Sequence, residues 1–227
     1  MTPRLRTPVS RRDRPAKPAL SRDGIVATAV AVMRAEGLEK VTMRRLAQEL
    51  DTGPASLYVY VANTAELHAA VLDELLGEVE FDQPGADWSE RLIGVLASYA
   101  NVLWQHPALA KSAVSARPSG RNYLRLLEKL LALLDEGGVP GEQAAWGVDV
   151  LLLAATATAA EHAEPASRQD WDATKQAVKD APAKTHPRLR ALAGPLLSGS
   201  PEQRRDWGFR AIINGISGTA VPKGVTS

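Results

Sequence analysis

The residues with the clearest capacity for molecular recognition lie in one short stretch, Pro54 to Tyr60. Serine and tyrosine hydroxyls hydrogen-bond bases or phosphates, and an alanine methyl contacts the methyl group of thymine. A helix over this stretch that buries Leu57 would leave small and polar side chains exposed near its N-terminus. Such a helix suits the major groove of DNA.

The residues before this stretch predict the helix that positions it. Thr42 is a good N-cap for a short helix, Asp51 to Gly53 form a tight turn, and Pro54 suits a first helical position. Helix pairs of this size present their second helix to DNA. Arg44 and Arg45, at the start of the first helix, are placed to meet the edge of the DNA. Short helix pairs also occur in many other all-helical proteins, so the spacing alone leaves a purely structural role open.

No residue set in the sequence suits catalysis or metal binding. The chain has no cysteine, and its four histidines include no pair at i, i+4, so neither thiol chemistry nor a zinc motif is present. No nucleophile-elbow pattern occurs. We therefore predict no catalytic residue, no metal and no cofactor. The densest titratable cluster, Glu161-His162 with Glu164, precedes Pro165. It is either a solvated helix end or, through Glu161, part of a pocket.

The net charge of +1 is unevenly distributed. Residues 1–22 carry +6 and residues 23–227 carry −5, which favours contact with a polyanion at one end only. Residues 1–20 contain four prolines and no apolar periodicity, so a disordered basic arm is predicted there, with a solubilising tail as the alternative. No apolar run is long enough to span a bilayer and no secretory signal occurs, which predicts a cytoplasmic protein without a membrane partner.

The rest of the chain has helical periodicity and no alternating β-branched runs, so an all-α fold is predicted. Residues 21–80 form the first predicted domain, 81–87 a connection and 88–218 a second, helical domain. Residues 165–187 are polar and contain three prolines, which predicts a mobile loop with a short helix around Trp171 to Val178. The predicted helices span about 22–36, 43–50, 54–60, 65–80, 88–106, 108–116, 119–135, 141–164, 188–197 and 201–217.

The segment from Ile25 to Leu76 closely resembles the DNA-binding domain of the TetR family of bacterial repressors. The matching residues are Gly37-Leu38, Val41-Thr42, Arg44, Leu46-Ala47, Ser56-Leu57-Tyr58 and Leu67. "DWSERL", "ARPSGRNY" and "LLEKLLALLDEGG" in the body look like the tetracycline repressor subgroup. The resemblance implies a three-helix helix-turn-helix domain followed by a ligand-binding and dimerisation domain. It also implies a ligand-responsive regulator, typically a repressor that a small molecule releases from a palindromic operator on double-stranded DNA, and association with the nucleoid.

Carried over by position, the resemblance assigns the DNA contacts. They are Thr42, Arg44, Pro54, Ala55, Ser56, Tyr58, Tyr60 and Thr64. Thr64 is a departure, because the family usually has a lysine there that neutralises a phosphate. Loss of a phosphate contact weakens binding to all DNA sequences alike, and the basic arm could replace it.

Reading two successive major grooves requires two recognition helices, so a homodimer is expected. The candidate interface residues are Ala154, Ala157, Phe209, Ile213 and Ile216, although the same apolar stripes could serve the chain's own core.

The candidate ligand pocket lies among the helices of the body, where aromatic residues indicate an apolar wall with polar tips. Its predicted residues are Val95, Tyr99, Leu103, Ala113, Arg117, Leu127, Trp146 and Glu161. Ala113 and Val95 stand where the tetracycline repressor has a histidine and an asparagine for its magnesium-chelated drug, so a largely apolar effector is expected. Arg117 could be a hinge, an anion contact or a simple surface bend. A small-molecule-binding helical protein or an enzyme, neither of which binds DNA, are the alternatives.

Overall fold

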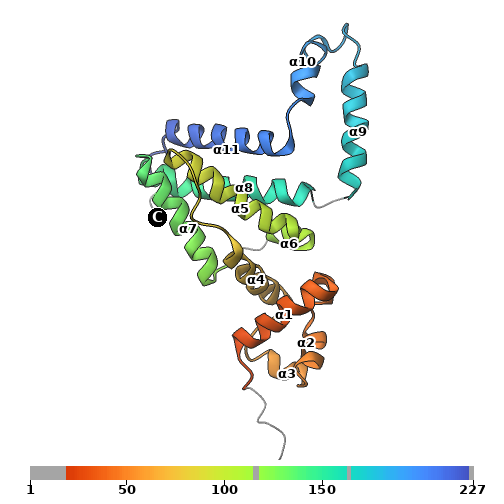
Figure 1. Cartoon of the computed structure of the whole chain (residues 1–227), viewed down its shortest axis with the longest axis vertical. Coiled ribbons are helices and arrows are strands. Elements are labelled where there is room, and N and C mark those ends of the chain that lie inside the picture. Colours follow the sequence, from red (N-terminus) through yellow and green to blue (C-terminus); the bar gives the residue numbers. More distant parts are fainter. Residues whose placement is uncertain (1–18, 115–117, 163–164, 225–227) are drawn as a thin grey trace, which may run out of the picture.

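The computed structural model describes residues 19–114, 118–162 and 165–224, and the regular structure in these ranges is entirely helical (Figure 1). The predicted all-α fold is confirmed. Of the predicted basic arm, only Ala19 and Leu20 belong to the described residues. The elements are α1 (Arg22–Glu36), η2 (Leu38–Lys40), α2 (Met43–Glu49), α3 (Pro54–Leu57), α4 (Thr64–Leu75), η3 (Leu76–Glu78), α5 (Trp88–Gln105), α6 (Pro107–Ala113), α7 (Arg121–Glu136), α8 (Gly141–His162), α9 (Pro165–Asp180), α10 (Pro187–Leu197) and α11 (Pro201–Gly218).

The head of the molecule begins with α1, whose two ends follow from local chemistry. Ser21 Oγ accepts the N–H of Gly24 at 3.1 Å and so caps the helix. Ile25 and Ala29, one turn apart, are fully buried. The helix ends at Gly37, which has φ +93° and donates its N–H to the carbonyl of Met33 at 2.8 Å. Glycine suits this position because a side chain strains a positive φ.

Helix α4 joins the head to the body. It packs against α1 and also against α6 and α7. Buried apolar side chains from Ile25 in α1 to Ile213 in α11 form one continuous cluster that runs through α4. The division into domains at residues 81–87 therefore follows the path of the chain but does not separate two cores, and it stays a prediction.

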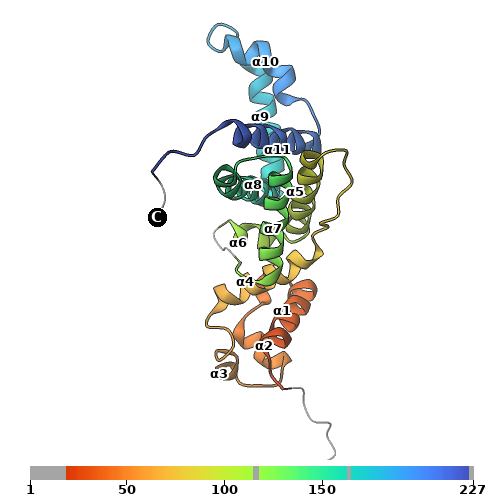
Figure 2. The same ribbon diagram turned by 90° about the vertical axis from the view of Figure 1, so that its left-hand side faces the viewer.

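Helix α8 is the central helix of the body and packs against α5, α6, α7 and α11 (Figure 2). Val148, Leu151 and Ala155 lie on its buried side. By length and composition its segment Gly141–Glu161, with a mean hydropathy of 1.3, could cross a membrane, which was not expected from the sequence. It is the single such segment in the described part of the chain. Packing inside the bundle accounts for part of this apolar character, since less than half of the segment is buried.

Helices α9 and α10 project from the body as a helical hairpin (Figures 1 and 2). The prediction of a loop over residues 165–187 with a short helix was wrong, because α9 alone has sixteen residues. Among residues 171–180, the part of α9 whose side chains the structure describes, little is buried, so no apolar stripe marked the helix in the sequence. Val178 is buried, Trp171 is exposed, and α10 buries no side chain.

Candidate nucleic-acid interface and cavity

The helix pair predicted to bind DNA forms as α2 and α3, at the end of the molecule opposite α10 and α11 (Figure 1). Thr42 Oγ1 accepts the N–H of Arg45 at 3.2 Å and caps α2. The turn between the helices contains Asp51, with φ +47°, and Pro54 is the first residue of α3. Leu57 is fully buried and anchors α3 to the head.

Helix α3 is shorter than expected. It ends at Leu57 rather than Tyr60, and the chain continues in hydrogen-bonded turns in which Tyr60 and Val61 donate their N–H groups to the Leu57 carbonyl at 2.9 and 3.1 Å. Tyr58 and Tyr60 therefore project from a turn after the helix.

All eight predicted DNA contacts are exposed to solvent. Tyr58 has 53% of its surface exposed, and Val59, which was not predicted, has 80%. Leu57 is thus the buried support of a segment whose other side chains face outward. The set comprises Thr42, Arg44, Pro54, Ala55, Ser56, Tyr58, Tyr60 and Thr64.

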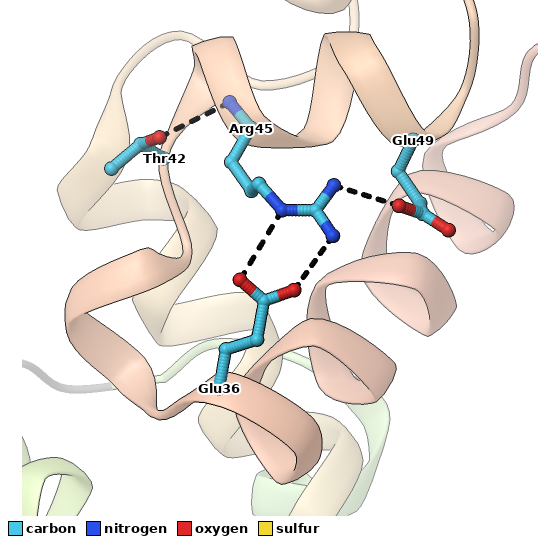
Figure 3. A network of polar contacts seen from close by, with 4 residues as sticks. All are labelled: Glu36, Thr42, Arg45 and Glu49. Carbon is cyan, nitrogen blue, oxygen red and sulfur yellow. Dashed lines mark hydrogen bonds and ion pairs between the residues drawn. The ribbon is translucent and has the colours of Figure 1, made fainter.

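Arg45 differs from its expected place at the edge of the DNA (Figure 3). Its guanidinium lies 2.6 and 3.3 Å from the two Glu36 carboxylate oxygens and 2.7 Å from Glu49 Oε2. These hydrogen bonds, those of Glu36 first, raise the pKa of Arg45, and the hydrogen bond from Arg45 is the main reason that the pKa of Glu36 is lowered. Arg45 therefore pairs with two carboxylates of the head, whereas the Arg44 side chain is exposed to solvent.

The first turn of α4 follows this segment in the chain, and the amide of Glu66 in this turn is capped. Asn63 Oδ1 accepts the N–H of Glu66 at 2.9 Å, and the Glu66 carboxylate accepts the N–H of Ala62 at 2.7 Å. The Asn63 side chain thus caps the helix, and the Glu66 carboxylate binds the main chain one residue before the N-cap. Thr64, where the resemblance implies a lysine, is the exposed first residue of the helix.

A cleft of about 460 Å³, including the space at its mouth, lies between the helices of the body. Its polar groups are two tyrosines, a threonine and an aspartate among apolar side chains. It has contributions from α4, α5, α6, α7 and α8. The lining residues are Leu72, Tyr99, Ala113, Val114, Pro118, Tyr123, Asp149, Leu152, Leu153 and Thr156.

The inner polar contact of this cleft joins Tyr99 Oη to Thr156 Oγ1 at 2.7 Å. Both side chains are buried. Burial is the main cause that raises the pKa of Tyr99 to about 12, so its hydroxyl stays protonated near neutral pH. The cleft thus offers neutral hydroxyls and aromatic surface, with a carboxylate, that of Asp149, at an exposed position on α8.

Two of the predicted pocket residues, Tyr99 and Ala113, line this cleft. The other predicted pocket residues that the structure describes do not line this cleft, so their role stays a prediction. Val95 and Leu103 are fully buried in the core, and Leu127 is half-buried against it.

Trp146 and Glu161, two further predicted pocket residues, are exposed on α8, and Arg117 lies outside the described residues. The sequence reading missed four residues of α8 that line the cleft, namely Asp149, Leu152, Leu153 and Thr156. Their i, i+3, i+4, i+7 spacing was a signal that could have placed them on one face.

Two of the predicted dimer residues need correction. Phe209 and Ile213 are each 2% exposed and belong to the chain's own core. Ile216 is half-buried so close to Gly147 that a Cβ on that glycine would lie 2.7 Å from its Cγ2. The alternative interpretation as core therefore holds for Phe209 and Ile213. Ala157 is exposed and Ala154 half-buried.

The large apolar side chains that α8 and α11 expose were not in the predicted interface. Trp146, Val150 and Leu153 on α8 are each about half exposed. Trp207 on α11 is 73% exposed. The three residues of α8 share one face of the helix, since they are separated by four and three positions.

Two family profiles match the chain. Residues 25–71 match "Bacterial regulatory proteins, tetR family", and residues 81–220 match "Tetracyclin repressor-like, C-terminal domain". A curated HTH-type transcriptional regulator from Saccharopolyspora erythraea is 28% identical over 212 residues, which are 90% of this chain and 87% of the relative.

Solved structures of similar proteins point to the same family. The transcription regulator SCO7704 from Streptomyces coelicolor is 61% identical with a TM-score of 0.79, covering 92% of this chain and all of that chain. The TetR family protein ActR of Streptomyces coelicolor, in complex with (S)-DNPA, is 39% identical with a TM-score of 0.75, covering 87% and 96%. ActR is also known in complex with actinorhodin. The exposed helix-turn-helix and the two profiles agree, and the C-terminal profile alone spans more than half of the chain. The protein therefore belongs to the TetR family, and it is a DNA-binding transcriptional regulator rather than an enzyme.

Proposed function

We propose that this regulator is a homodimeric repressor that binds a palindromic operator and is released by a small molecule in the body cleft. The observation that carries the proposal is the exposed segment Pro54 to Tyr60, anchored by the buried Leu57. Such a repressor acts in the cytoplasm and is associated with the nucleoid while it is bound to DNA.

The exposed segment supplies both kinds of contact that specific DNA binding needs. Ser56 and Tyr58 carry hydroxyls for bases or phosphates, and the Ala55 methyl suits a thymine methyl. Arg44 and Thr42, at the start of α2, would contact the DNA backbone. With Thr64 in place of a lysine at the start of α4, we assign compensating phosphate contacts to the basic arm, residues 1–20.

The dimer would form through the exposed face of α8 together with α11. Trp146, Val150 and Leu153 supply apolar surface on α8, Ala157 allows close approach, and Trp207 extends the surface on α11. Aromatic residues at the centre of an interface contribute most of its binding energy. Two heads joined in this way would have to read grooves roughly 34–36 Å apart.

The effector would be a largely apolar molecule with aromatic character. The two tyrosines and the aliphatic side chains of the cleft favour stacking and burial, and the Tyr99–Thr156 pair offers hydrogen bonds to a few polar groups. The complexes of the relative ActR with (S)-DNPA and actinorhodin support a small-molecule effector. Release is a population shift between a conformation that binds DNA and one that does not. The effector can weaken DNA binding by no more than the ratio of its affinities for these two conformations.

The test is a binding titration of the DNA upstream of the protein's own gene, and fluorescence anisotropy of the labelled DNA measures the binding. We expect a nanomolar dimer to bind one pseudo-palindrome in preference to a scrambled duplex. Addition of (S)-DNPA or actinorhodin tests whether a molecule of this chemistry releases it. A protein that binds a small molecule but no duplex would instead be a carrier without DNA binding.

A further inference from the structure

A carboxylate on α4 caps the N-terminus of α7. The Asp73 carboxylate accepts the N–H of Tyr123 at 2.9 Å and that of Asn122 at 3.4 Å. The N-cap position of α7 is Gly120, which has no side chain for these amides. Negative charge is favourable at a helix N-terminus, where the first amides lack partners within the helix.

A third hydrogen bond, donated by a side chain of α7 to the main chain of α4, completes this joint between the two helices. The side-chain amide of Asn122 donates to the main-chain carbonyl of Asp73 at 2.8 Å. Asp73 is therefore held at both its carboxylate and its carbonyl, and α4 cannot rotate at this point without breaking bonds to α7. Only 8% of the Asp73 surface is exposed, so water competes little for these bonds.

The two helices also approach each other closely at this joint. A Cβ on Gly120 would lie 2.1 Å from Asp73 Oδ2 and 2.2 Å from its Cγ. The φ of Gly120 is −85°, which any residue adopts, so the space and not the backbone requires glycine. Any side chain at position 120 would therefore collide with the Asp73 carboxylate in its present place.

The joint borders the cleft described above. Leu72, the neighbour of Asp73 on α4, lines it, and so does Tyr123, whose N–H the carboxylate accepts. A molecule in the cleft would press on both partners of the cap. Asp73 lies nine positions after Thr64, so at about 1.5 Å per residue α4 carries any movement roughly 14 Å towards the head.

We propose that Asp73 is the positioning residue that couples the cleft to the DNA-binding head. Its cap on α7 fixes the orientation of α4 in the DNA-binding state, and displacement of the start of α7 releases it. Small displacements of a few ångströms between packed helices are typical of such switches. The regulatory meaning of the joint depends on the proposed function, whereas the effect of the cap on the head does not.

The experiment measures the orientation of the head directly. Because the chain has no cysteine, Val59→Cys and Ala132→Cys place two spin labels, one on the head and one on α7. Dilution with excess unlabelled chain leaves one labelled copy per assembly, so dipolar spectroscopy reports the distance within one chain without DNA or effector. We expect one narrow distance distribution when Asp73 is intact.

Asp73→Ala should broaden this distribution or shift it by about 3 Å. Gly120→Ala should do the same, because its Cβ would displace the carboxylate. The double variant should differ little from Asp73→Ala alone, since the two changes act on one contact. The matched control is Glu74→Ala, which removes the exposed neighbour that lies 3.8 Å from Arg121 in the same joint. It should leave the distribution unchanged.

A merely structural role of Asp73 would lower the Tm but leave the distance unchanged, and this result would overturn the proposal. Asp73→Asn, which keeps the shape of the side chain, gives the same readout if the alanine variant does not fold. In protein without spin labels, loss of the cap should lower the affinity for the upstream DNA by about fivefold or more. If the chain with intact Asp73 binds no DNA, the proposed function fails, and the distance measurement still decides the role of Asp73.

Discussion

The guanidinium of Arg45 donates two hydrogen bonds to the carboxylate of Glu36, at 2.6 and 3.3 Å, and so ties the end of α1 to α2. This contact holds the helix that precedes the recognition segment. It also explains why Arg45, unlike its neighbour Arg44, does not face the DNA-binding surface.

Glu36→Gln should lower the Tm slightly at pH 7, because it weakens the pair of hydrogen bonds between Arg45 and residue 36. Arg45 lowers the pKa of Glu36 below its ordinary 4.5 in the folded protein. The stabilisation is therefore fully present above about pH 4.5 and is lost as the pH falls through the folded pKa. Thermal unfolding at pH 7 and at lower pH measures the difference between the two proteins, with Glu39→Gln as control. A difference that does not shrink in acid would contradict the ion pair.

Tyr58→Ala should reduce specific DNA affinity by about tenfold to a hundredfold, the cost of one or two lost contacts. The side chain is 53% exposed, so the fold should remain intact. Anisotropy with the upstream DNA and light scattering measure the two properties. Leu192→Ala, at a site 59% exposed on α10, is the control. If Tyr58→Ala dissociates the dimer, Tyr58 has a structural role instead.

Leu153→Glu should convert the proposed dimer to monomers, since a charge without a partner is costly in an apolar interface. Light scattering gives the mass, and DNA affinity should fall at least about tenfold. Leu124→Glu is a closely matched control, because Leu124 on α7 is 58% exposed and Leu153 is 56% exposed. Equal masses for both variants and the unmodified protein would exclude α8 from the interface.

Tyr99→Phe should lower the free energy of unfolding by about 1 kcal/mol, because it leaves the buried hydroxyl of Thr156 without this partner. The phenol of Tyr99 has its pKa raised to about 12 by burial. The unfolded chain gives up this proton first, so stability should fall as the pH rises from 10 towards 12. Urea unfolding tests the first effect. Urea unfolding repeated at rising pH tests the second. In an ultraviolet titration, the component that titrates near 12 should be absent from the variant.

Deletion of residues 1–20 should weaken binding to all DNA sequences alike and reduce the salt dependence of binding. The arm carries six basic residues against one acidic residue, and each phosphate contact adds about 0.9 to the salt slope. Titrations at several salt concentrations measure it. An unchanged slope would assign the phosphate contacts elsewhere.

Local chemistry made the head predictable from the sequence. Ser21, Thr42 and Asn63 cap their helices through neighbours three residues away, and Gly37 ends α1. Such contacts depend only on nearby residues, so their pattern is visible in the sequence. The same holds for Leu57, whose burial leaves its neighbours exposed.

The body was less predictable because its contacts join distant parts of the chain. An apolar stripe on α11 looks alike whether Phe209 faces the chain's own core or a second copy, and only the packing against α8 decides. The cleft combines side chains from five helices, so Leu72 could not be assigned to it. The fold of α9 was missed because a helix that buries little has no apolar stripe.

The continuous core through α4 has a consequence for engineering. A chimera that exchanges heads between related regulators would have its splice point inside a shared interior, because α4 is packed on both sides. A junction placed at residues 81–87 would transplant α4 away from the α7 surface that fits it. Functional hybrids should therefore require the start of α7 from the same parent as α4.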